Sequence, residues 1–182
     1  MKYSKTDIIT LHNSCNPKYL LFWGHTPNGQ TVGKECLSQW YGCKFESEGV
    51  SYHTAEQYMM AQKALLFGDK EIYSRIMKAA SPADFKKLGQ QVHGFDEEKW
   101  KEARCGIVIK GNYAKFSQNE ALKSFLLGTG EKILVEASPY DKIWGIGIPA
   151  DDKKSENPNF WKGLNLLGFC LMEVRDMLRE EQ

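Results

Sequence analysis

The sequence predicts an α+β fold that is mostly helical, with a small β component. Three observations support this class. The first third of the chain is rich in aromatic, glycine and turn-forming residues, helix start signals follow one another from residue 54, and a short apolar run at 132–136 stands alone between turn-forming residues. The length of 182 residues suits one compact domain, predicted over 1–182 with its core at about 20–178.

The predicted strands lie near the start of the chain and again late in it. Residues 19–23 (YLLFW) form an apolar run typical of a buried strand, and residues 24–29 (GHTPNG) follow it as a turn. Residues 37–45 are a second strand-like stretch, and residues 50–52 are a short third one. Residues 132–136 (KILVE) complete the β component.

Helix signals dominate after residue 53. Thr54 and Gln57 make a capping box, because the hydroxyl and the amide each satisfy one free backbone N–H. Ser81 and Pro82 mark the start of another helix, since serine is a good N-cap residue and proline suits the first helical position. The predicted helices therefore begin near residues 54, 69, 81 and 96, with two more over 119–127 and 164–178.

A long loop over residues 137–161 separates the last strand from the last helix. Loops beyond about 12–15 residues in a compact domain are usually functional or disordered. This one holds Trp144 with Gly145 beside it, and small neighbours let a flat ligand approach an indole and its backbone. A buried indole that anchors the loop is the alternative interpretation.

Composition excludes several classes of protein. Hydrophobic residues make up 42% of the chain and charged residues 26%, which argues against disorder. The net charge of +1 argues against a strong, sequence-independent DNA-binding protein, which needs surplus cations. We expect no membrane partner, because no apolar run approaches the roughly 20 residues that cross a bilayer, and the first residues do not read as a signal peptide.

The residue types that commonly bind metals are few in this sequence and do not cluster. The five cysteines show no C-x-x-C spacing, and the four histidines are isolated from one another. Free thiols fit a reducing compartment, so we expect a cytoplasmic protein without a metal site. Phosphate-binding and dinucleotide-binding glycine motifs are absent too, and we expect no cofactor.

The helix that begins at Thr54 carries the best candidates for chemistry. Glu56 and Lys63 are seven residues apart, close to two helical turns, so both point to the same side. An amphipathic core helix whose charges reach solvent is the alternative. Once the other motifs are excluded, the candidate functional groups are carboxylates, a lysine and aromatic side chains. This set favours an acid-assisted hydrolase.

At these residues the chain resembles the YbiA-like, or NADAR, N-glycosidases. The resemblance spans nearly the whole chain and keeps the order of several segments. They are LSQWY at 37–41, AEQYMMAQK at 55–63, Trp100 with Arg104, the KF pair at 115–116, and the closing block at 134–147 and 161–175. The chain departs from the family at Gln57, where histidine is usual, at Gln39, where asparagine is common, and at Met59, Met60 and Leu166.

The resemblance implies an enzyme that hydrolyses the N-glycosidic bond between a ribosyl carbon and a nitrogenous base. The family's substrates are ADP-ribose attached to guanine and the phosphoribosylated aminopyrimidine intermediates of riboflavin synthesis. Cleavage builds positive charge on the ribose and negative charge on the departing base, so a carboxylate or amine and a proton donor are expected. A module that binds ADP-ribose or a nucleotide without cleaving it is the alternative.

The resemblance also implies roles for individual residues. Glu56, Lys63 and Asp141 are the expected catalytic residues. A lysine that attacks the opened ribose as a Schiff base is a further implication, with Lys44 and Lys115 as rivals of Lys63. The expected substrate-binding residues are Trp23, Trp40, Lys44, Tyr58, Trp100, Arg104, Glu136, Trp144, Gly145 and Asn165.

Overall fold

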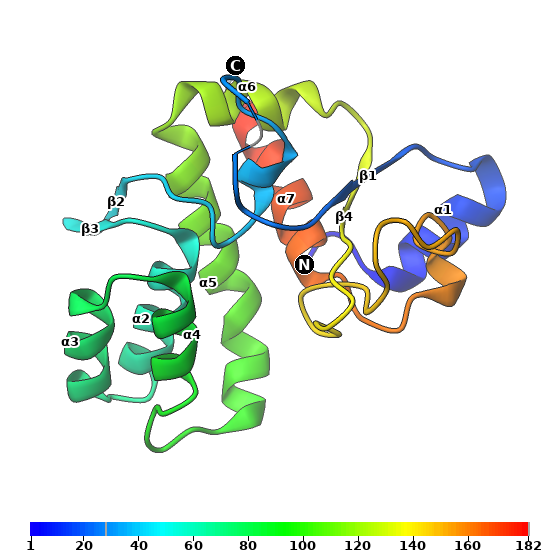
Figure 1. The fold of residues 1–182 in the computed structure, drawn as a ribbon. Helices are drawn as coiled ribbons and strands as arrows, with labels where there is room; N and C mark the ends of the chain where they lie inside the picture. Colours follow the sequence, from blue (N-terminus) through cyan, green and yellow to red (C-terminus); the bar gives the residue numbers. More distant parts are fainter. Residues whose placement is uncertain (28, 182) are drawn as a thin grey trace. The chain divides into compact units, whose positions relative to one another are not determined.

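The computed structural model describes residues 1–27 and 29–181, so Asn28 of the expected turn lies outside the described residues. The described chain holds seven α-helices, two short 3-10 helices and four short strands, which confirms the mostly helical α+β class (Figure 1). It divides into two compact units. Unit 1 joins Met1–Ser38 to Glu120–Gln182, and unit 2 is the continuous segment Gln39–Asn119. One domain over 1–182 stays a prediction.

Unit 1 is built on two parallel strands. Strand β1 pairs with β4 in a register that sets Tyr19 opposite Ile133 and Phe22 opposite Glu136. Helix α7 packs on β4, and α6 packs on α7. The elements of this unit are α1 (Lys5–Cys15), β1 (Tyr19–Phe22), η1 (Lys34–Leu37), α6 (Glu120–Gly128), β4 (Ile133–Glu136), η2 (Pro158–Phe160) and α7 (Leu166–Glu180).

The core of unit 1 lies between β4 and α7. Ile133, Leu134 and Val135 are all buried, as expected for a strand covered on both faces. Gly168 lets the helix approach this strand closely, because a Cβ at this position would stand 2.1 Å from the Leu134 carbonyl oxygen. The buried Arg175 donates to Thr129 Oγ1 at 2.9 Å and to the Lys132 carbonyl at 2.8 Å, which fixes the turn between α6 and β4.

Unit 2 is a β-hairpin followed by four helices. Glu48 and Gly49 both have positive φ, as a tight type I′ hairpin turn requires. Helix α2 is central and packs against α3, α4 and α5. The elements are β2 (Phe45–Ser47), β3 (Val50–Tyr52), α2 (Ala55–Leu66), α3 (Lys70–Lys78), α4 (Pro82–Gly89) and α5 (Glu97–Ser117).

The expected helix caps are confirmed. The Thr54 hydroxyl accepts the Gln57 N–H at 3.0 Å, and the Gln57 amide oxygen accepts the N–H of His53 at 2.9 Å. At the start of α4, the Ser81 hydroxyl accepts the Asp84 N–H with Pro82 in the first turn. These caps depend on neighbours within four residues, so the sequence alone was sufficient to locate them.

Two expectations about elements were wrong, and one helix was missed. Residues 37–45 do not form a strand, since they begin at the end of η1 and only Phe45 enters β2. Helix α1 was not predicted, because Ile8 is its one buried residue and the apolar pattern is correspondingly weak. The last helix begins at Leu166 rather than at Leu164, which is 46% exposed, because Asn165 adopts a left-handed conformation. Among the described residues, no helix is both long and apolar enough to cross a bilayer.

The packing of α7 on β4 gives a first prediction. Gly168→Ala should lower the free energy of unfolding by about 1–3 kcal/mol, the usual cost of overpacking, because its methyl group would meet a backbone oxygen that cannot move away alone. Urea unfolding measures this change. Gly106→Ala is the matched control inside α5, where nothing lies within 4 Å, and it should be stabilising by about 0.5–1 kcal/mol. Equal stability of the two variants would contradict the close approach.

Candidate functional site

The expected site residues are divided between the two units. Unit 2 holds Trp40, Lys44, Glu56, Tyr58, Lys63, Trp100 and Arg104, and unit 1 holds Trp23, Glu136, Asp141, Trp144, Gly145 and Asn165. Within each unit, the structure brings some of these residues together and gives others a role in packing.

In unit 2, Glu56 lies in the first turn of α2 and is only 4% exposed. Its backbone N–H donates to the carbonyl of Gln39 at 2.9 Å. The side-chain oxygen of Gln39 accepts from Asn112 Nδ2 at 2.8 Å, and the same nitrogen donates to the Val108 carbonyl at 2.9 Å. Asn112 of α5 thereby holds residue 39, and residue 39 holds the backbone that carries the Glu56 carboxylate.

Two polar atoms of the Gln39 and Asn112 side chains have no hydrogen-bond partner in the described residues. They are Gln39 Nε2 and Asn112 Oδ1, both buried. An unpaired buried polar group costs about 1–3 kcal/mol, so native proteins keep few of them. The Gln39 side chain reaches Asn112, which the sequence alone gave no reason to single out.

Lys115 belongs to the same neighbourhood. It lies on α5 three residues after Asn112 and is fully buried. Its ammonium nitrogen stands 5.6 Å from the ring centroid of Tyr41 and 5.1 Å from that of Phe116. Tyr41 continues the segment that holds Glu56. We call Gln39, Glu56, Asn112 and Lys115 the buried polar cluster.

Lys63 and Trp100 meet near the other end of α2. The Lys63 ammonium donates to the Gly89 carbonyl at 2.8 Å and lies 4.3 Å from the ring centroid of Phe95 and 5.6 Å from that of Trp100. Burial lowers the pKa of Lys63. Seven residues correspond to about 10 Å along a helix, so Lys63 lies two turns from Glu56. The sequence did not indicate Phe95, whose partner is distant in the chain.

The remaining expected residues of unit 2 lie in different surroundings. Tyr58 fills the core, with its ring centroid 5.1 Å from that of Tyr52. Trp40 is half-buried, and Lys44 is exposed. Arg104 is half-buried, and its Nε has no hydrogen-bond partner among the described residues.

In unit 1, Asp141 organises the loop that follows β4. One oxygen of its carboxylate accepts the N–H groups of Ile143 and Trp144, each at 2.8 Å. The Ser138 hydroxyl in turn accepts the N–H of Asp141 at 3.1 Å. Asp141 therefore fixes the backbone of Trp144, whose side chain is half-buried.

The side chain of Asn165 forms hydrogen bonds with the edge of β4 that does not pair with β1. Its side-chain oxygen accepts the Glu136 N–H at 2.9 Å, and its nitrogen donates to the Leu134 carbonyl at 2.9 Å. Gly145 lies beside the end of the strand, where a Cβ would stand 2.8 Å from the Glu136 carbonyl oxygen. Asn165, Gly145 and Glu136 are thus brought together, through contacts that hold the backbone.

The N-terminus of α7 is covered by the same loop. The carbonyls of Ile143, Trp144 and Gly145 accept the N–H groups of Leu166, Leu167 and Asn165 respectively, at 3.1–3.2 Å. These donors are the ones that a helix leaves free at its start. Because the loop uses them, they are not available to bind an anionic ligand.

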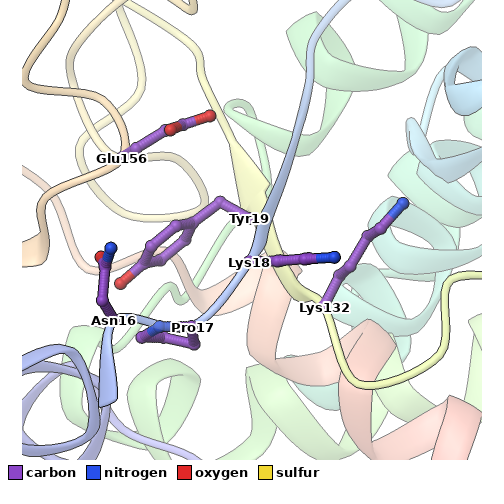
Figure 2. A pocket seen from close by; sticks show the side chains of 6 residues that line it. All are labelled: Asn16, Pro17, Lys18, Tyr19, Lys132 and Glu156. Carbon is purple, nitrogen blue, oxygen red and sulfur yellow. The ribbon is translucent and has the colours of Figure 1, made fainter. Parts of the chain in front are cut away.

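An open cavity of about 480 Å³ lies elsewhere in unit 1, and Figure 2 shows the side chains that line it. Its lining side chains are Asn16, Pro17, Lys18, Tyr19, Lys132 and Glu156. Burial raises the pKa of Tyr19 to about 12. None of the expected site residues lines this cavity. In residues 1–27 and 29–181, no group of three or more His, Cys, Asp or Glu side chains is arranged to hold a metal ion.

The comparisons with known proteins agree with one another on the family of this chain. The NADAR domain family matches residues 21–179. The N-glycosidase R617 of Acanthamoeba polyphaga mimivirus is 44% identical over 164 residues, covering 87% of this chain and 95% of that protein. The N-glycosidase YbiA of Escherichia coli is 30% identical over 135 residues, covering 74% and 76%. The NMR structure of E. coli YbiA aligns with a TM-score of 0.70 at 25% identity, covering 91% of this chain and 87% of that one.

The Asn112 contacts generate a second prediction. Asn112→Ala should lower the free energy of unfolding by about 1–3 kcal/mol, because it leaves the buried side-chain oxygen of Gln39 without its donor and removes a second hydrogen bond to the Val108 carbonyl. Gln118→Ala is the matched control, since this amide also makes two hydrogen bonds, both with Glu46, but at the surface. Water replaces exposed hydrogen bonds, so the control should lose less than about 1 kcal/mol. Urea unfolding of both variants checks this, and equal losses would contradict it.

Proposed function

Because the chain belongs to the NADAR domain family, we propose that it is an N-glycosidase that hydrolyses the bond between a ribosyl C1 and a nitrogenous base. The names of the mimivirus and E. coli relatives support this activity. One structural observation carries the proposal: Glu56 is a buried carboxylate whose backbone is fixed by Gln39 and, through it, by Asn112. Hydrolysis of this bond needs a rigidly placed negative charge.

The proposed chemistry uses Glu56 beside the anomeric carbon. The C–N bond breaks with its electron pair going to the base, which takes up a proton, while water supplies the hydroxyl that joins C1. A carboxylate on the face of the ribose stabilises the positive charge that develops there, or removes the proton of the attacking water. The start of a helix favours a negative charge, so α2 supports a carboxylate at position 56.

A covalent route through a lysine is a refinement of this proposal. The amine attacks C1 of the opened ribose, the base departs, and water later hydrolyses the imine. The attacking amine must be neutral, which burial favours. Lys115 is fully buried and its ammonium lies 5.6 Å from the ring centroid of Tyr41, two residues after the Gln39 carbonyl that accepts the Glu56 N–H. On this placement we favour Lys115 as the covalent residue, with Lys63, which donates to the Gly89 carbonyl, as its rival.

Two substrate classes fit the proposal. They are ADP-ribose linked to guanine, in a nucleotide or a nucleic acid, and phosphoribosylated aminopyrimidines. Both contain a ribosyl–base bond and phosphates, and the half-buried Arg104 is a suitable phosphate ligand because guanidinium pairs with phosphate bidentately. Incubation with each substrate, followed by chromatography and mass spectrometry of the released base and sugar, tests the activity.

Binding of ADP-ribose or a nucleotide without cleavage is the second candidate. One observation favours it: an oxygen of Asp141, the other expected catalytic carboxylate, accepts two backbone N–H groups and so has a scaffold role. Saturable binding of both substrates without release of base would decide for this function and against the glycosidase.

The role of Glu56 gives a third prediction. Glu56→Gln should lose roughly 10²-fold or more in kcat, the usual scale of acid–base catalysis, while circular dichroism remains that of the folded protein. The control is Glu98→Gln, an exposed carboxylate of α5 that pairs with Lys101 and should keep wild-type kcat. Wild-type turnover by a folded Glu56→Gln variant would remove this residue from the mechanism.

Borohydride trapping gives a fourth prediction. Reduction during turnover should attach the sugar to Lys115, because borohydride converts an imine into a stable secondary amine. Peptide mass spectrometry locates the adduct, and Lys115→Arg should abolish it. An adduct on Lys63 or on the exposed Lys44 would move the covalent role to that residue. Turnover without any adduct would instead make water the direct nucleophile.

A further inference from the structure

A buried carboxylate ties two segments of unit 2 together. Asp69 lies between α2 and α3, and its side chain is only 6% exposed. Its backbone N–H donates to the Ala64 carbonyl at 2.9 Å, in the turn of α2 that carries Lys63. One oxygen of its carboxylate accepts the backbone N–H of His93 at 2.9 Å and lies 2.8 Å from His93 Nδ1. Asp69 thereby attaches residues 90–96, which connect α4 to α5, to the end of α2.

The connection at 90–96 places an aromatic ring over Lys63. Phe95 follows His93 by two residues, and its ring centroid lies 4.3 Å from the Lys63 ammonium. Just before the connection, the Gly89 carbonyl accepts a hydrogen bond from the same ammonium at 2.8 Å. Phe95 is 46% exposed and its ring meets Phe67 at 5.4 Å, so burial alone does not hold it. The place of the ring therefore depends on the attachment of the backbone at His93.

We propose that Asp69 is a positioning residue for Lys63: by holding His93 it keeps Phe95 over the ammonium and gives the lysine side chain one fixed place. The proposal rests on the N-glycosidase activity proposed above, in which Lys63 is an expected catalytic residue. A free lysine side chain has many rotamers, and fixing it has an entropic cost. A group that is held in place before the substrate arrives avoids this cost during the reaction.

The charge of Asp69 suits this task. Hydrogen bonds from the backbone N–H groups of His93 and Ile72 lower the pKa of Asp69 to about 2. The carboxylate is therefore ionised at neutral pH, and hydrogen bonds to a charged acceptor are stronger than neutral ones. The contact with Ile72, at 3.0 Å, caps α3 and uses the other carboxylate oxygen. Because the two tasks use different oxygens, a substitution can remove one and keep the other.

Two substitutions separate the attachment from the helix cap. Asp69→Ser keeps a good N-cap hydroxyl but has no second oxygen for His93. Asp69→Asn has the shape of the native side chain and keeps the capping oxygen, while its amino group faces the His93 N–H instead of an acceptor. The matched control is Asp96→Ser, since Asp96 caps α5 through the Lys99 N–H at 2.9 Å. His93→Ala is a second control, because the backbone N–H of residue 93 remains.

Nuclear magnetic resonance of the lysine side chains tests the placement without any substrate. In the wild type, the ring current of Phe95 should shift the CεH2 protons of Lys63 upfield, and Lys63→Arg identifies their signal. Asp69→Ser and Asp69→Asn should move this signal to the position of exposed lysines, whereas both controls should keep it. Burial lowers the pKa of Lys63, so exposing the amine should also raise the midpoint of its pH titration.

Kinetics of the proposed reaction give a second test. Asp69→Ser should lower kcat/KM by up to about 10²-fold, the scale of a misplacement of about 1 Å. A residue that acts only through Lys63 has no effect once Lys63 is removed. The double variant of Asp69→Ser with Lys63→Ala should therefore match Lys63→Ala alone.

Two outcomes would overturn the proposal. One is a Lys63 signal and titration midpoint that are the same in the wild type and in folded Asp69→Ser and Asp69→Asn proteins. The other is additive losses in the double variant, which would give Asp69 a role independent of Lys63. The spectroscopic test needs no turnover, so its failure is distinguishable from an absence of glycosidase activity.

Discussion

The hydrogen bonds between the Asn165 side chain and β4 are the interaction on which unit 1 depends. A sheet of two parallel strands leaves the second edge of each strand open, and a buried peptide group without a partner is costly. The amide of Asn165 resembles a peptide group, and it satisfies the Leu134 carbonyl and the Glu136 N–H as a third strand would. Because Asn165 is also the first residue before α7, the same contact sets where the helix begins. The loop carbonyls at 143–145 then complete the helix start, and Trp144 and Gly145 follow as consequences of that closure.

Unit 2 uses a buried amide in a comparable way. Asn112 ties a segment without regular structure to a helix through Gln39, and Gln39 receives the N–H of Glu56. In both units an asparagine side chain makes hydrogen bonds that no neighbouring strand or helix supplies. Asn165 does so beside Glu136, and Asn112 does so at Gln39, which contacts Glu56. A side-chain amide suits this task because it offers both a donor and an acceptor without introducing a charge. The backbone N–H of Glu56 is consequently held by a neutral carbonyl group.

The parts of the fold that follow from local chemistry could be predicted from the sequence, and the parts that depend on distant contacts could not. The caps at Thr54 and Ser81 were located because donor and acceptor lie within a few residues. Residues 37–45 have the aromatic content of a strand, but Trp40 and Tyr41 belong to the irregular segment around the buried polar cluster, and tertiary contacts outweigh β propensity there. Glu56, Trp144 and Asn165 were reached through local patterns and a family resemblance. Asn112 and Phe95 were not, since Gln39 and Lys63, which they contact, lie more than 30 residues away in the chain.

The two carboxylates expected to be catalytic differ in what their surroundings leave them to do. One oxygen of the Asp141 carboxylate accepts two backbone N–H groups, so this side chain already stabilises the turn that carries Trp144. The Glu56 carboxylate is buried in the first turn of α2, and the cap of that helix comes from Thr54. A residue that gains or loses charge during a reaction should not also be the cap that holds a helix start together. On this ground we propose that the acid–base or electrostatic chemistry falls to Glu56, while Asp141 is a positioning residue that keeps Trp144 in place.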